Sequence, residues 1–301
     1  MQGSYHYVRL DGKPPSRTGL FFKLLGYDIR FGFGSNKVLF LISFMVFLVL
    51  ALMFSSAASM PSIGDGEGGF IDLTDEYASA VDYLLSFYKG IEVFNPAGSK
   101  TFDLPVFWLG IQVCVALLVS LYPSRDLYSY APQVFVRTRN KWIWWLAKCF
   151  WIIITVLAFY TIGIIIALVA ALIGGGSALE VNVLLNAFFN KLDVFGLEPL
   201  DFVFLLLLPA VVSIALSLVQ MALSFIVKPV WSFIVIMSYH LVSWVVFSPF
   251  LISDYGMLAR NGLFIRNGLA SEFMLLVCCA VIVFVVIVGI PLFRRMNLYQ
   301  K

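Results

Sequence analysis

Residues 149–173 read CFWIIITVLAFYTIGIIIALVAALI, an apolar run without a charged side chain. A helix needs about 20 residues, at about 1.5 Å each, to cross roughly 30 Å of hydrocarbon. The run does not alternate between polar and apolar residues, which argues against the strands of a β-barrel. Because a backbone in lipid must satisfy its own hydrogen bonds, the run predicts a membrane-spanning helix within 143–173.

The whole chain has the composition of a membrane protein. Apolar residues make up 61% of the 301 residues, charged residues make up 12%, and the mean hydropathy is +0.95. A soluble domain has roughly 45–50% apolar residues and could not hide this excess from water. We therefore predict an all-α integral membrane protein with six transmembrane helices, over 38–58, 104–122, 143–173, 202–227, 229–252 and 273–293.

Only Lys228 and Pro229 separate the fourth and fifth of these helices. A single helix of about 50 residues would be far too long for one crossing, and proline interrupts helix hydrogen bonding. The sequence therefore predicts a tight hairpin at this point.

Charge gives the orientation. Most of the 20 Lys and Arg lie before the first helix, in the loop 123–142 and in the C-terminal tail, whereas all but three of the 17 acids lie in the other connections. The three exceptions are Asp11, Asp28 and Asp126. Because Lys and Arg favour the cytoplasmic side, both termini are expected in the cytoplasm.

The chain is expected to form one membrane domain with an N-terminal extension. Residues 1–37 form a cytoplasmic tail with an amphipathic interfacial helix, because 19–37 mixes apolar and basic side chains that suit the headgroup boundary. An ordinary basic flank of the first helix is the alternative. Residues 38–301 form the six-helix domain, with a large outer loop at 59–103. The loop 253–272 suits a short re-entrant or surface helix.

Few ionisable residues fall deep inside the predicted helices. Lys148 lies near a cytoplasmic helix end, and His240 is the one candidate close to mid-membrane. This pattern argues against a proton-coupled carrier, which keeps buried carboxylates or His relays. We expect His240 to be neutral and hydrogen-bonded between helices, with Tyr239 or Ser243 as candidate partners. A contact with transported substrate is the alternative.

No enzyme site is visible in the sequence. Only His6 and His240 occur, so a His-Glu-x-x-His metal site cannot form, and no Gly-x-x-x-x-Gly-Lys-Ser/Thr loop is present. The four cysteines fall inside predicted helices and show no disulfide or zinc spacing. We expect no catalytic site, cofactor, metal or nucleic-acid partner.

The most informative segment is cytoplasmic, where residues 133–148 read QVFVRTRNKWIWWLAK. Four side chains offer hydrogen-bond donors to a partner protein or a lipid phosphate: Gln133, Arg137, Arg139 and Lys141. Three tryptophans are expected to anchor the next helix at the membrane interface: Trp142, Trp144 and Trp145. Simple retention of positive charge in the cytoplasm is the alternative explanation.

Together with the basic stretch 19–37, the long first outer loop and the short element before the last helix, this segment resembles the permease subunits of type-2 ABC transporters. The resemblance is to small six-span bacterial forms that act with a separate ATPase. It implies an exporter in the bacterial cytoplasmic membrane, with two permease subunits, identical or paralogous, and an ABC ATPase subunit docked on 125–141. The substrate would be an amphipathic peptide, a lipid or a similar molecule, and the permease itself would hydrolyse nothing.

Two other functions fit the same sequence. The chain could be a non-transporting membrane scaffold or peptide-resistance factor that binds lipid or partners through its outer loops. An ion-coupled secondary carrier is less favoured, because few ionisable residues fall inside the predicted helices.

Overall fold

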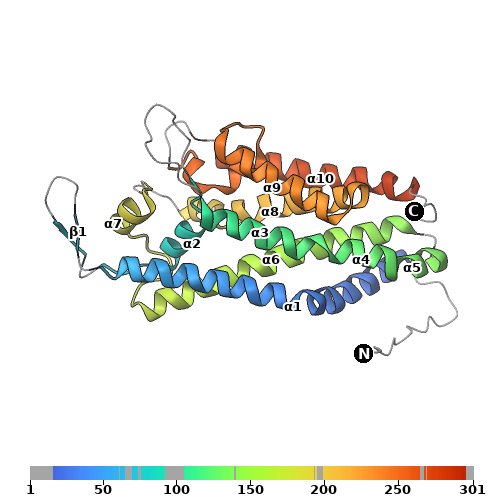
Figure 1. Cartoon of the computed structure of the whole chain (residues 1–301), viewed down its shortest axis with the longest axis horizontal. Coiled ribbons are helices and arrows are strands. Elements are labelled where there is room, and N and C mark those ends of the chain that lie inside the picture. The colour runs from blue at the N-terminus through green and yellow to red at the C-terminus, as the bar shows by residue number, and fades with distance from the viewer. Residues whose placement is uncertain are drawn as a thin grey trace.

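The protein is an elongated bundle of helices in a computed structural model (Figure 1). The structure describes residues 16–60, 62–64, 70–73, 76–91, 105–138, 140–192, 194, 199–264, 268 and 270–295. Five of its helices are long and apolar enough to cross a membrane, which indicates a multi-pass membrane protein. They are contained in α1 (Arg17–Ala58), α3 (Val106–Ser120) with α4 (Tyr122–Ser129), α6 (Lys141–Ile173), α8 (Pro199–Val227) and α10 (Ser271–Arg295).

A sixth apolar helix, α9 (Pro229–Val245), is shorter. The break between α8 and α9 falls at Lys228, as the sequence predicts. Lys228 has a φ of 76°, a left-handed value that a helix cannot continue, and Pro229 starts the next helix. The two helices pack against each other as a hairpin.

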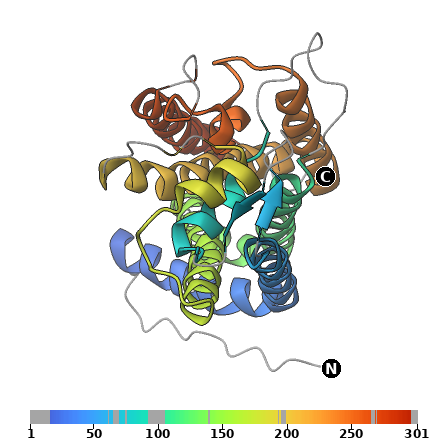
Figure 2. The same ribbon diagram turned by 90° about the vertical axis from the view of Figure 1, so that its left-hand side faces the viewer.

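Helix α1 is continuous across residue 37, the boundary expected between the N-terminal extension and the membrane domain. In its first half the buried residues recur every four positions: Leu20, Leu24, Asp28, Gly32 and Asn36. This spacing keeps them on one helix face. Figure 2 shows this first half crossing beneath the end of the bundle, while the second half runs along the bundle axis.

Helix α6 forms the centre of the bundle and contacts α1, α2, α3, α8 and α10. Its residue Trp151 fits against Gly32 of α1, where a side chain would collide with the indole. Trp145 stacks on Phe293 of α10 with ring centroids 4.9 Å apart. In lipid, close packing of this kind replaces the hydrophobic effect as the force between helices.

The two ends of the bundle differ (Figure 1). One end, here called the α5 end, carries α4, α5 (Ala131–Thr138) and the start of α6. The other, the α2 end, carries the following elements: the hairpin of β1 (Ser62–Gly64) and β2 (Phe70–Asp72), α2 (Ala80–Tyr88), α7 (Val183–Leu185) and the π-helix η1 (Asn186–Asn190).

The segment after α9 folds back into the bundle. It forms two 3₁₀ helices, η2 (Ile252–Gly256) and η3 (Leu258–Arg260), and residues 253–261 are buried. The sequence suggested a short re-entrant or surface helix over 253–272, whereas the structure has two buried 3₁₀ turns, the first of which begins at Ile252.

Candidate functional site

Three charged side chains meet in the interior of the α5 end and form what we call the buried charge cluster: Lys148, Asp28 and Asp126. The Lys148 ammonium pairs with Oδ1 of Asp28 on α1 and lies 2.7 Å from Oδ2 of Asp126 on α4. All three side chains are buried. A buried charge is stable only when it is paired, so the cluster joins three helices at one point.

Two aromatic side chains complete the cluster. The Tyr122 hydroxyl donates to Asp28 Oδ1 at 2.9 Å, and Trp144 Nε1–H donates to Asp126 Oδ2 at 2.9 Å. The Lys148 ammonium also lies over both rings, 4.5 Å from the Tyr122 centroid and 5.2 Å from that of Trp144. These distances allow cation–π attraction, which grows when the cation is desolvated.

Helical spacing explains this geometry. Tyr122 and Asp126 lie four residues apart on α4, and Trp144 and Lys148 lie four residues apart on α6, so each helix presents one aromatic and one charged group on the same face. From the sequence, Lys148 was expected near a cytoplasmic helix end, and Asp28 and Asp126 stood out only as acids among the cations of the cytoplasmic side, so the cluster was not predicted. The repeated aromatic-to-charge spacing of four was the available signal.

Helices α4 and α5 carry exposed side chains that form what we call the α4–α5 surface: Arg125, Tyr128, Gln133 and Val136. Tyr128 is 66% exposed and Val136 is 65% exposed. The opposite face of α5 is buried through Ala131, Val134 and Phe135. The α4–α5 surface therefore leaves two large apolar side chains, beside Arg125 and Gln133, uncovered by the rest of the chain.

The predicted coupling residues are distributed around this surface. Gln133 is exposed on α5, and Lys141 begins α6. Arg137 lies in α5, but its side chain falls outside the described residues, as does the whole of Arg139.

The tryptophans lie differently from what the sequence suggested. Trp142 is half-buried, whereas Trp144 and Trp145 are buried inside the protein. Trp144 bonds to Asp126, and Trp145 Nε1–H donates to the Val286 carbonyl at 3.1 Å. Because neighbouring helices cover both rings, these two residues hold the bundle together and do not anchor it in the headgroup region.

His240 is buried, but its partner is neither of the two expected residues. Its Nδ1 is hydrogen-bonded to Ser253 Oγ in η2, and its ring meets Trp108 edge-on at 5.3 Å. The adjacent Asp254 binds Arg260 and the Ser248 N–H, so it does not orient the imidazole as the acid of a Ser-His-Asp triad does. Because Ser253 is also fully buried, the pair has the geometry of a structural contact.

Residues 73–299, well over half of the chain, match a family described as "Protein of unknown function (DUF2705)". The chain belongs to the DUF2705 family. No curated protein and no solved structure matches it. Asp126 and Lys148 lie within the matched range of this DUF2705 protein, and Asp28 lies before it.

A second buried ion pair lies at the α2 end of this DUF2705 protein. Arg260 Nη1 lies 2.7 Å from Asp254 Oδ1, and both side chains are inaccessible. The guanidinium also donates to the carbonyls of Ser243 and Trp244, which end α9, and to the Ile91 carbonyl. Burial raises the pKa of Asp254 to about 6 and lowers the pKa of Arg260. The pair therefore fastens η2 and η3 to the end of α9.

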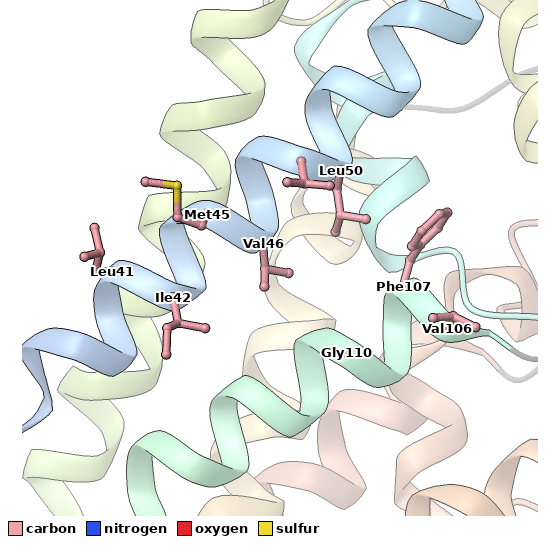
Figure 3. A pocket seen from close by; sticks show the side chains of 9 residues that line it. Leu41, Ile42, Met45, Val46, Leu50, Val106, Phe107 and Gly110 are labelled. Atoms are coloured by element: carbon pink, nitrogen blue, oxygen red, sulfur yellow. The ribbon is translucent and has the colours of Figure 1, made fainter.

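The bundle also has an apolar groove of about 480 Å³ between α1 and α3 (Figure 3). Its lining is apolar throughout: Leu41, Ile42, Met45, Val46, Val49, Leu50, Val106, Phe107 and Gly110. A side chain at Gly110 would meet nothing within 4 Å, so this part of the groove is open. Such a lining suits an acyl chain or another helix and offers no polar group for catalysis.

Metal binding finds no support in the described part of the chain, where no three His, Cys, Asp or Glu side chains gather. The DUF2705 protein thus presents three features for function: the buried charge cluster, the α4–α5 surface and the apolar groove.

Proposed function

We propose that the chain crosses the membrane six times, with α9 as the sixth span and the α5 end in the cytoplasm. Helix α9 has 17 residues and so a length of about 25 Å, at the short end of the range for a span. The exposed charged side chains described at the α5 end are all cations: Arg17, Lys23, Arg30, Lys37, Arg125, Lys228 and Arg294. This distribution agrees with the tendency of Lys and Arg to remain in the cytoplasm.

We further propose that the protein is the transmembrane subunit of an ATP-driven exporter and that its α4–α5 surface binds a separate ATPase subunit. The observation that carries this proposal is the α4–α5 surface itself, which exposes Tyr128, Gln133 and Val136. On the buried side of α4, the ion pairs of the buried charge cluster hold this helix to α1 and α6. A surface can transmit force from a partner only if its helices are held firmly to the rest of the protein. The sequence holds no P-loop, so ATP hydrolysis would occur in the partner.

Two copies of this chain, or one copy and a paralogue, would form the translocation pathway in a bacterial cytoplasmic membrane. An amphipathic peptide, a lipid or a similar molecule is the proposed substrate. The apolar groove between α1 and α3 supports this substrate class, because it can accept the apolar part of such a molecule from the bilayer.

Co-purification tests the ATPase contact. The genes beside that of this chain are searched for a P-loop ATPase, which the proposal expects there; the chain is expressed with it, and complex formation and ATP hydrolysis are measured. We expect Tyr128→Glu and the pair Arg137→Glu/Arg139→Glu to weaken binding by about tenfold or more, as loss of central interface residues does. Leu179→Glu is the matched control, because Leu179 is 73% exposed but lies on the connection at the α2 end. Unchanged binding in both α4–α5 variants would refute the proposal.

The buried charge cluster also favours a second candidate, an ion-coupled carrier. Two carboxylates share one ammonium, and Asp28 Oδ2 is buried without a hydrogen-bond partner among the described residues, which leaves a place for a proton. Transport that stops when the ion gradient is dissipated at constant ATP would support this carrier over the exporter.

A further inference from the structure

Four kinds of contact connect the first half of α1 with α4 and with Tyr130, the residue that follows α4. The Tyr122 hydroxyl on α4 donates directly to Asp28 Oδ1 at 2.9 Å. The buried charge cluster links Asp28 to Asp126 through Lys148. Tyr27 stacks on Tyr130, which lies between α4 and α5, with ring centroids 4.3 Å apart. Arg125 Nη1 donates to Ser35 Oγ at 3.4 Å on the exposed surface. The first half of α1 is therefore in contact with α4, the helix that carries part of the α4–α5 surface.

These contacts differ in how they respond to movement. The Arg125 contact is long for a hydrogen bond and exposed, so water can replace it at little cost. Stacked rings can slide. The buried charge cluster cannot loosen gradually, because separating Lys148 from either carboxylate leaves a charge buried without a partner. It therefore behaves as a contact with two discrete states, intact or broken, and such contacts transmit displacement.

We propose that the buried charge cluster is the joint through which a displacement of the α4–α5 surface reaches the first half of α1. Asp126 moves with α4, Asp28 moves with α1, and Lys148 on α6 holds both. This inference rests on the proposed function, since an ATPase on the α4–α5 surface would supply the displacement. It adds that the first half of α1 is an element that responds to this displacement.

If the cluster only stabilises the α5 end and transmits nothing, a different result is expected. Removing it would then loosen the whole α5 end, but a disturbance in α4 would reach α1 equally well with or without it. The two cases are separated by a double-mutant cycle, which measures the interaction between sites and not the cost of either change alone.

The experiment uses the full chain in lipid nanodiscs, without an ATPase, and measures hydrogen–deuterium exchange. Tyr128→Pro disturbs α4 from an exposed position, because proline removes a helix hydrogen bond without deleting a buried side chain. It is introduced into the wild type and into a neutral-cluster background, Asp28→Asn/Lys148→Met/Asp126→Asn, which also carries Tyr122→Phe so that the direct hydrogen bond from α4 to residue 28 is removed. Tyr128→Gly is the milder alternative if the proline variant does not fold.

In the wild type we expect the variant to accelerate exchange in 122–136 and also in 17–36, the latter by between about twofold and a hundredfold, the range that corresponds to ordinary coupling between contacting residues. In the neutral-cluster background only 122–136 should change. An equal acceleration of 17–36 in both backgrounds, or none in the wild type, would overturn the joint. If the double-mutant cycle gives the expected result but no ATPase binds, the proposed function is refuted and the joint stands.

Discussion

Lys148 Nζ lies 2.7 Å from Asp126 Oδ2 inside the bundle, and the same ammonium pairs with Asp28. These two acids are the only ones described at the α5 end, and both point inward. The outer surface of that end therefore presents cations alone among its exposed described charges. The cluster therefore joins helices in the interior. Because it also keeps both described acids inside, the exposed cations of this end can attract acidic partners or anionic lipid.

Removing the shared cation should be the most damaging single change in the cluster. Lys148→Met leaves two buried carboxylates facing each other, and we expect a loss of about 3–5 kcal/mol of unfolding free energy, as for other broken buried ion pairs. The neutral-cluster variant Asp28→Asn/Lys148→Met/Asp126→Asn should recover most of this loss, because no charge remains unpaired. Thermal unfolding in detergent measures both. A triple variant no more stable than Lys148→Met would contradict the explanation.

The helices could be predicted from the sequence because their signal is local. The apolar runs and the dipeptide Lys228-Pro229 place four of the six helices within a few residues of where they lie. Helix α1, however, begins at Arg17 and not at residue 38, and α9 ends at Val245 and not at residue 252. The buried turns of 253–261 fall in the predicted connection. Whether six helices span the bilayer is still a prediction, since five meet the length and hydropathy of a span and α9 is shorter.

The partners of individual side chains could not be found in this way. Asp28 and Lys148 are 120 residues apart in sequence and meet only because α1 packs on α6. Trp144 and Trp145 carry the usual composition of an interfacial belt, yet tertiary packing turned both rings inward. Ser253 reaches His240 because η2 folds back into the bundle, a path that no local pattern encodes.

At the α2 end, Arg260 should not tolerate replacement by Lys. The guanidinium bonds to Asp254 and to three carbonyls at once, and a lysine ammonium is a single point donor that cannot match this fork. We expect Arg260→Lys to increase hydrogen–deuterium exchange at the end of α9 and in 252–260 while leaving 17–36 unchanged. The cluster variant Lys148→Met should show the reverse pattern. Exchange that rises uniformly along the chain in either variant would argue against two independent ion-pair sites.

The stability of the α2 end should depend on pH through Asp82. Its carboxylate caps α2 and accepts hydrogen bonds from Ser79, Asn182 and Asn186, but none of the ion pairs in the described residues includes it. Burial raises the pKa of Asp82 above its ordinary value of 3.8, despite the hydrogen bonds. The folded state then holds the proton more tightly than the unfolded chain, so the contribution to stability is greatest at low pH and falls as pH rises through the folded pKa.

Thermal unfolding between pH 4 and pH 7 checks this sign. We expect the wild type to lose more stability over the interval than Asp82→Asn does, because the amide does not titrate. Glu180→Gln, which removes an exposed acid, serves as the control and should follow the wild type. If the stability of the wild type and of Asp82→Asn changes with pH in the same way, burial does not raise the pKa of the Asp82 carboxyl.

Two glycines in α1 offer a matched pair for testing how closely α1 packs on α6. A Cβ at Gly32 would lie 2.4 Å from Trp151 Nε1, whereas a Cβ at Gly34 would meet nothing within 4 Å. We expect Gly32→Ala to cost about 1–3 kcal/mol of unfolding free energy through overpacking. Gly34→Ala should gain up to about 1 kcal/mol, since alanine favours a helix more than glycine does. If the two variants unfold at the same temperature, α1 and α6 do not approach as closely as described. If only Gly32→Ala also raises exchange around Asp28, the close approach of the helices and the buried charge cluster depend on each other.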